Sequence, residues 1–275
     1  MRSTGSFPEV THPVAVVGKV IDLLEAIAAT GPLGLTEIAG RTSINKASAF
    51  RILSTLEARG YVEREASSRR YQPGPKLLAL GMSLVSSLDI LRSARPELVS
   101  LAEEFGETVN LGLLNEGKVL YLDIIQSRFG LRMSAEIGNR DPLHSTALGK
   151  AILAPMPASE LRQALANCNW ERFTPNTLVT LNALEQDLKG ARERGYSIDD
   201  QENEHGARCI AVPVMNQKGR ATAALSVSGP AARIDSAQVA RIGERLKSVA
   251  LSIQGRMGYA TLADQPMVAS GTTRI

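Results

Sequence analysis

The densest group of chemically reactive side chains lies in the segment SIDDQENEHGARCIAVPV. His205 and Cys209 have the spacing of metal ligands, with Asp199 or Glu202 as a third ligand, but no second Cys or His lies nearby to complete a zinc site. Cys209 with His144 or His205 as its base would make a nucleophile, yet no nucleophile elbow accompanies it. We therefore expect neither a metal nor a cofactor, and a solvated acidic loop before a buried cysteine is the simplest interpretation.

The segment PLHSTALGKAILA has the pattern of a helix whose first turn can bind an anion. Ser145 or Thr146 can cap this helix, and Ala147 and Leu148 follow with small or apolar side chains. The first N–H groups of a helix have no partner within it, and the helix dipole favours negative charge there. A carboxylate could approach these N–H groups, although a capped helix in the core would show the same pattern.

The strand ALSVSGP carries two hydroxyl groups that alternate along the chain. Because side chains alternate across a strand, Ser226 and Ser228 point to one face and Leu225 and Val227 to the other. The hydroxyls would line a polar cavity or face solvent. With the helix start and Asp199 they suit a small oxygen-rich acid, since a carboxylate can accept hydrogen bonds from ligand hydroxyls. No pair that activates water accompanies them, so we predict binding and not turnover.

Basic charge is concentrated near the N-terminus, although the whole chain has a net charge of only +3. Residues 40–76 hold eight Lys or Arg against three Asp or Glu. Such a local excess is typical of a module that binds a polyanion. The predicted helix 45–59 has an apolar stripe from Ala49 to Leu56, and its opposite face is small, polar and basic. A face of this kind suits insertion into a DNA groove.

Three predicted helices and a basic ribbon make up this N-terminal part. The helices are expected at 14–29, in TEIAGRT with Thr36 as its cap, and at 45–59. The segment YVEREASSRRYQP predicts a two-stranded ribbon that turns at Ala66–Ser68. Together they indicate a winged helix-turn-helix, whose second motif helix enters the major groove of DNA. The residues expected to contact DNA are Thr36, Asn45, Lys46, Ala47, Ser48, Arg51, Arg69 and Arg70.

The rest of the chain predicts a linker helix followed by an α+β domain. The linker helix is expected over 75–92, and Pro96 is expected to start a new helix that ends at residue 105. Two hairpins, one of them over 108–125, alternate with amphipathic helices and with a strand at 129–138, which indicates an antiparallel or mixed sheet. The predicted division is a flexible arm (1–13), a winged helix-turn-helix domain (14–74), the linker helix (75–92), a sensor domain (93–257) and a loose tail (258–275).

Composition and terminal sequence exclude several classes of protein. Two cysteines do not make a disulfide framework, so a reducing compartment is expected. The N-terminal MRSTGSFPEVTHP lacks the apolar core of a signal peptide. No run of about 18 apolar residues is present to span a membrane. We therefore expect a cytoplasmic protein without a membrane partner.

Three segments resemble the IclR-type bacterial transcriptional regulators: LTEIAGRTSINKASAFRILSTLEARGYVER, LHSTALGKAIL and RGYSIDDQENEHGARCIAVPVMNQKGRATAALSVSGPAARI. The resemblance covers about residues 14–257, and its last segment is long and specific. It implies a winged helix-turn-helix, a linker helix and a C-terminal effector-binding domain with a GAF-like sheet. It also implies homodimers, often paired into tetramers, that bind double-stranded DNA at palindromic operators.

The resemblance further implies a pocket for a small organic-acid effector. By position, the pocket residues are Met133, Ala147, Leu148, Asp199, Cys209, Ser226 and Ser228. Some relatives that bind very small keto acids have Gly-Ala where this chain has Ala147-Leu148, so their ligand cannot be carried over. We expect a transcriptional regulator, not an enzyme, whose operator binding the effector changes. The alternative is a cysteine-dependent small-molecule enzyme with an accessory DNA-binding arm.

Overall fold

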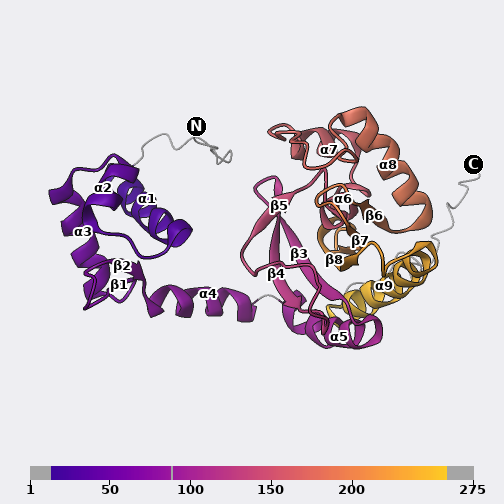
Figure 1. Cartoon of the computed structure of the whole chain (residues 1–275), viewed down its shortest axis with the longest axis horizontal. Coiled ribbons are helices and arrows are strands. Elements are labelled where there is room, and N and C mark those ends of the chain that lie inside the picture. Colours follow the sequence, from indigo (N-terminus) through magenta and orange to yellow (C-terminus); the bar gives the residue numbers. More distant parts are fainter. Residues whose placement is uncertain (1–13, 88, 259–275) are drawn as a thin grey trace, which may run out of the picture. The chain divides into compact units, whose positions relative to one another are not determined.

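The computed structural model describes residues 14–87 and 89–258 of the 275. The chain divides into two compact units, residues 1–88 and 89–275, whose elements are labelled in Figure 1. Each unit has its own hydrophobic core. The arm predicted at 1–13 and the tail predicted beyond residue 258 lie outside the described residues. Within the described ranges, no helix is long and apolar enough to cross a membrane.

The first unit consists of helices and a two-stranded ribbon. In chain order its elements are α1 (Ala15–Thr30), α2 (Leu35–Thr42), α3 (Lys46–Ala58), β1 (Val62–Arg64), β2 (Tyr71–Pro73) and α4 (Pro75–Ser87). The first three helices pack around Leu23, Ile27 and Leu53, because each carries apolar side chains at helical spacing. The strands β1 and β2 pair antiparallel, and Tyr71 joins the same core. The unit has the helix-turn-helix architecture predicted from the sequence.

The start of α2 differs from the prediction. Thr36 lies inside the first turn and does not cap the helix, since the residue before α2 is Gly34 with an extended backbone. The Glu37 carboxylate accepts a hydrogen bond from the Gly34 N–H at 2.7 Å. A glutamate three residues into the motif thus satisfies a donor at this helix start, and no threonine hydroxyl is needed.

The second unit is a six-stranded sheet with helices on both faces. In chain order its elements are α5 (Asp89–Phe105), β3 (Thr108–Asn115), β4 (Lys118–Ile125), β5 (Arg140–Pro142), α6 (Ala147–Leu153), α7 (Ala158–Ala164), α8 (Leu181–Arg194), β6 (Ser197–Asp200), β7 (Ala207–Met215), β8 (Ala221–Pro230) and α9 (Ser236–Arg256). The strand order is β5-β4-β3-β8-β7-β6, and every neighbouring pair is antiparallel. The helices α5 and α9 cover one face, and α6 covers the other with α8 against it (Figure 1). The predicted α+β class is confirmed, with an antiparallel sheet.

The helix α5 contradicts the prediction that a new helix starts at Pro96. It runs through Pro96, whose side chain is exposed. On its other side, Ile90, Ala94 and Leu98 form a buried stripe. Packing of that stripe against the sheet outweighs the one backbone hydrogen bond that the proline removes. The linker helix predicted over 75–92 corresponds to α4 and the start of α5.

The segment 129–138 forms a loop and not the predicted strand. The strand of this region is the short β5, which follows the loop. Leu131 and Ile137 are exposed, so the alternating apolar residues have no core to cover. Gly138 adopts a φ of +91°, which breaks an extended chain before β5 begins.

The strand β6 has no counterpart among the predicted elements. This strand pairs with β7, which places Asp199 opposite Cys209. The Asp199 side chain is buried there. Glu202, just beyond the strand, is also buried. The interpretation of this segment as a solvated loop is therefore wrong at these two residues. Pairing with β7 and the cover of α6 bury side chains that acidic composition alone assigns to solvent.

Candidate functional site

The exposed face of α3 carries most of the side chains predicted to contact DNA. Asn45 is the N-cap residue, and its Oδ1 accepts a hydrogen bond from the Ser48 N–H at 2.8 Å. Lys46, Ala47 and Arg51 are exposed, while Ser48 is half-buried. Short side chains at the helix start let the backbone approach a groove, and the two basic residues extend from the same surface. The face has the form that a DNA-reading helix requires.

The two arginines of the ribbon have different surroundings. Arg69 is exposed at the turn, where its backbone adopts a φ of +55°. The Arg70 guanidinium donates to the Pro32 carbonyl at 2.9 Å and pairs with the Glu37 carboxylate at 2.8 Å. The Gly34 N–H and this guanidinium hold the pKa of Glu37 below its usual value. Arg70 thus links the ribbon to α2, whereas the exposed Arg69 suits a phosphate contact.

A row of polar side chains crosses the inner face of the second unit's sheet. Asp199 of β6 lies opposite Cys209 of β7, and Cys209 lies opposite Ser228 of β8. Ser226 lies opposite Asn110 of β3. Directly opposed residues in antiparallel strands share a face, and so do Ser226 and Ser228, which lie two positions apart on β8. The polar row therefore steps along β8 from Ser228 to Ser226 and draws on four strands. These side chains line a cavity of about 120 Å³, a volume that limits any ligand to a small molecule.

The start of α6 closes the cavity from the other side. Thr146 is its N-cap, and the hydroxyl oxygen accepts a hydrogen bond from the Gly149 N–H at 3.1 Å. Ala147 and Leu148 line the cavity, and the first N–H groups of a helix have no partner within it. A Cβ atom on Gly149 would lie 2.4 Å from the Leu143 backbone. Glycine is therefore required where α6 approaches the preceding segment.

Asp199 is a buried carboxyl group that the backbone holds in place. Its Oδ1 accepts hydrogen bonds from the N–H groups of Glu202 at 2.7 Å and Asn203 at 3.3 Å. Burial raises the pKa of Asp199 to about 6, although the Glu202 N–H and the Lys150 charge act in the opposite direction. The Ser145 hydroxyl donates to Asn203 Oδ1 at 2.8 Å and ties this loop to the start of α6. Because this pKa lies close to neutral, a charge that binds beside Asp199 can change its protonation state.

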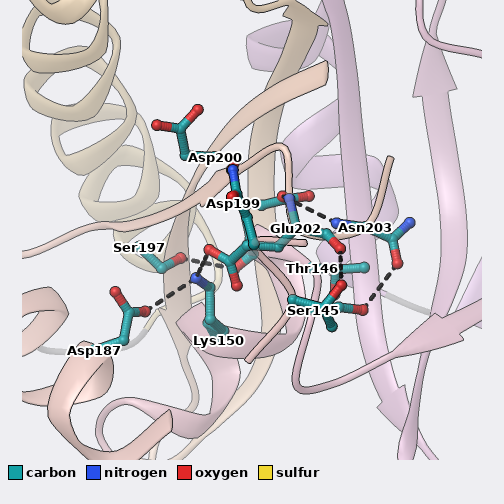
Figure 2. A network of polar contacts seen from close by, with 12 residues as sticks. Ser145, Thr146, Lys150, Asp187, Ser197, Asp199, Asp200, Glu202 and Asn203 are labelled. Carbon is teal, nitrogen blue, oxygen red and sulfur yellow. Dashed lines mark hydrogen bonds and ion pairs between the residues drawn. The ribbon is translucent and has the colours of Figure 1, made fainter. Parts of the chain in front are cut away.

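A buried lysine joins the two elements that enclose the cavity, as Figure 2 shows. The Lys150 side chain is 0% exposed, and its Nζ lies 2.5 Å from Glu202 Oε1 and 3.0 Å from Asp187 Oδ2. Burial raises the pKa of Glu202 to about 7, against the opposing effect of Lys150. Because Lys150 belongs to α6 and Glu202 follows β6, this ion pair fixes the distance between the helix start and the Asp199 loop.

Cys209 lacks the surroundings of an activated nucleophile. Burial and the nearby Asp199 raise the pKa of its thiol, which disfavours the thiolate. The His144 ring nitrogens lie 3.5 Å from Cys168 Sγ and 3.0 Å from the Glu171 carbonyl, so this histidine is engaged away from Cys209. Among the residues that the structure describes, no group of three or more His, Cys, Asp or Glu side chains is arranged to hold a metal ion.

The structure brings all the predicted pocket residues to one cavity and adds several that the sequence did not indicate. The predicted ones are Met133, Ala147, Leu148, Asp199, Cys209, Ser226 and Ser228. The added polar ones are Asn110, Tyr121, Ser134, Glu136, Asn139, Asp141, Thr146, Asn203 and Glu204. In the described part of the chain no Lys or Arg lines this cavity. The Tyr121 hydroxyl donates to Asp141 at 2.8 Å, and burial raises the pKa of this phenol.

Comparison with known proteins places both units in one family. Residues 82–255 match the family described as bacterial transcriptional regulator IclR C-terminal, and residues 16–66 match the IclR helix-turn-helix domain. The HTH-type transcriptional regulator KdgR of Escherichia coli (strain K12) is 37% identical over 246 residues, covering 90% of this chain and 94% of that protein. The transcriptional repressor IclR of the same organism is 33% identical over 236 residues, covering 85% of this chain and 86% of that protein.

A solved structure agrees with these sequence matches. The Thermotoga maritima IclR is similar with a TM-score of 0.74 at 31% sequence identity, and the match covers 90% of this chain and 100% of that one. The two Escherichia coli relatives are named as a transcriptional regulator and a transcriptional repressor, and not as enzymes. The chain described above therefore belongs to the IclR family of DNA-binding bacterial transcriptional regulators.

Proposed function

We propose that this regulator changes its affinity for operator DNA when a small carboxylic acid binds in the cavity of the second unit. The observation that supports the proposal is the row of hydrogen-bonding side chains from Asp199 to Asn110, which lies buried beside an apolar core. Burial of polar groups is unfavourable unless they are hydrogen-bonded, and their convergence on a cavity indicates a ligand site.

Neutral donors surround the position proposed for the carboxylate. The Ala147 and Leu148 N–H groups and the Ser226 and Ser228 hydroxyls reach the cavity from opposite sides. The raised pKa of Asp199 lessens repulsion, because the carboxyl group can take up a proton when an anion binds beside it. Hydrogen bonds from neutral groups, and not an ion pair, thus carry the recognition in this proposal.

The DNA side of the proposal is a symmetric assembly. A homodimer presents two copies of α3 to successive major grooves of a palindromic operator, with Lys46 and Arg51 as the main contacts and Arg69 on a phosphate. Two dimers can pair into a tetramer. A chromosomal target places the protein in the cytoplasm. The ligand acts only through its different affinities for two states of the dimer, with a coupling of about 1–3 kcal/mol.

Fluorescence anisotropy on DNA from upstream of its own gene, against random DNA and over a salt series, tests this function. We expect tight, sequence-dependent binding with a steep salt dependence. Carboxylic acids added to the same assay should release or tighten the complex. The variant Ser226→Ala with Asp199→Ala should bind DNA normally and lose that response. An unchanged response in this variant contradicts the proposed pocket.

A further inference from the structure

Asn110 occupies the end of the polar row on β3 and has no place among the residues predicted from the sequence. Its side chain is 3% exposed and lines the cavity. The amide Nδ2 donates to Ser226 Oγ at 3.0 Å and to Ser228 Oγ at 3.2 Å. Ser226 Oγ and Ser228 Oγ therefore act as acceptors toward the amide, and their hydroxyl protons remain available to the cavity. Both hydrogen bonds to the serines thus come from Nδ2 and none from Oδ1.

The other end of this amide is unsatisfied. Asn110 Oδ1 is buried and has no hydrogen-bond partner among the described residues. A buried carbonyl oxygen without a partner is unfavourable, and it can only accept hydrogen bonds. Any group that satisfies it must therefore be an O–H or N–H donor. A carboxylate oxygen placed here would meet a second acceptor and be repelled.

The remaining cavity wall points to the same kind of ligand. The carboxyl groups of Glu136, Asp141, Asp199 and Glu204 line the cavity, and no Lys or Arg of the described residues does. An excess of acceptors disfavours a ligand made of carboxylates alone and favours one that carries hydroxyl groups as well. This argument uses side chains from two stretches of the chain, 136–141 and 199–204, and does not depend on Asn110.

We infer that Asn110 is a specificity-determining residue that selects hydroxylated carboxylic acids, with its Oδ1 accepting a hydrogen bond from a ligand hydroxyl group. The inference rests on the proposed function, since it concerns the same cavity. It adds the chemical class of the effector: a small acid with at least one hydroxyl group. The two serines bind the amide of Asn110 and keep its oxygen available.

Matched pairs of acids test the inference on the full chain. Thermal stabilisation at pH 7 and constant ionic strength would be measured for lactate against propionate, 3-hydroxybutyrate against butyrate, and gluconate against hexanoate, and converted to dissociation constants. We expect the hydroxylated member of at least one pair to bind about tenfold tighter, as expected for one hydrogen bond to a buried acceptor. In Asn110→Leu, which keeps the volume and removes the acceptor, the preference should disappear.

A matched control separates this role from a structural one. Asn115 lies on the same strand, also has a buried amide oxygen without a partner among the described residues, and does not line the cavity. Asn115→Leu should retain the hydroxyl preference. If Asn110→Leu fails to melt cooperatively, Asn110→Ala provides the same comparison with less bulk.

Each outcome distinguishes the inference from the proposed function. If the acids bind without a hydroxyl preference, or if the preference persists in both Asn110 variants, the inference is wrong. The proposal that the effector is a carboxylic acid still holds in that case. Stabilisation by no acid of any pair overturns the proposed effector class and the inference with it. A preference present in the wild type and in Asn115→Leu but lost in Asn110→Leu supports both.

Discussion

The substitution Lys150→Met tests whether the buried ion pair holds the pocket together. Methionine keeps most of the length of the side chain and removes its charge, so Glu202 and Asp187 lose their common partner. Removing one member of a buried pair typically costs about 3–5 kcal/mol, because the other charge stays buried without compensation. Against a total stability of about 5–15 kcal/mol, such a loss is large.

The pH dependence of this loss follows from the carboxyl group left behind. Burial already raises the pKa of Glu202 from 4.5 to about 7 in the folded protein. When folding raises the pKa of a carboxyl group, the folded protein is favoured at pH values below the pKa of the unfolded state. This stability is lost as the pH rises through the pKa of the folded state. Without Lys150 the pKa of Glu202 rises further, so this site is nearly neutral in both proteins at pH 5, and the loss caused by the substitution grows as the pH rises above about 7.

Urea denaturation of both proteins at pH 5 and pH 8 measures the effect. We expect Lys150→Met to lower the free energy of unfolding by about 3–5 kcal/mol at pH 8, and by about 1 kcal/mol less at pH 5. The double variant Lys150→Met with Glu202→Gln should recover much of the loss at pH 8, because no buried charge remains at that position. A loss that is equal at both pH values, or below about 1 kcal/mol at pH 8, refutes the reasoning.

Three further predictions follow from the two sites. Arg51→Ala should weaken specific operator binding by about 1–3 kcal/mol in anisotropy measurements, whereas equal losses on random DNA would make Arg51 a phosphate contact. Because an anion beside Asp199 raises its pKa from about 6, a carboxylate effector should bind more tightly at pH 5.5 than at pH 8. Calorimetry of Asp199→Asn should show a flat pH profile, and a slope that persists in this variant places the titrating group elsewhere. Gly149→Ala should lower the free energy of unfolding by about 1–3 kcal/mol or more, because its Cβ would overlap the Leu143 backbone, and a wild-type urea midpoint would contradict that close approach.

Periodicity within short segments was enough to predict most elements. The helices α1 and α3, the hairpin of β3 and β4, and the hairpin of β7 and β8 follow from apolar spacing and turn residues. Strand alternation also placed Leu225 and Val227 in the core and turned Ser226 and Ser228 the other way, as the structure confirms. These predictions succeed because each depends on residues within one element.

Predictions failed where a distant segment decides the outcome. Pro96 does not interrupt α5, because the sheet beneath buries the rest of that helix. The apolar alternation of 129–138 produces no strand, because no core lies behind it. Asp199 and Glu202 are buried although their neighbours Asp200 and Glu204 are exposed, since β7 pairs with β6 and α6 packs against it.

The sequence by itself determined the two-domain plan, the exposed basic face of α3 and the group of residues from which a pocket could be built. Only the tertiary structure decided which of them meet. Antiparallel register brings Asn110 against Ser226, 116 residues away, and the packing of α6 sets Lys150 against Glu202, 52 residues away. The physical reason is that burial and hydrogen-bond partners depend on strand order and layer packing, and these join segments whose own periodicities carry no information about one another.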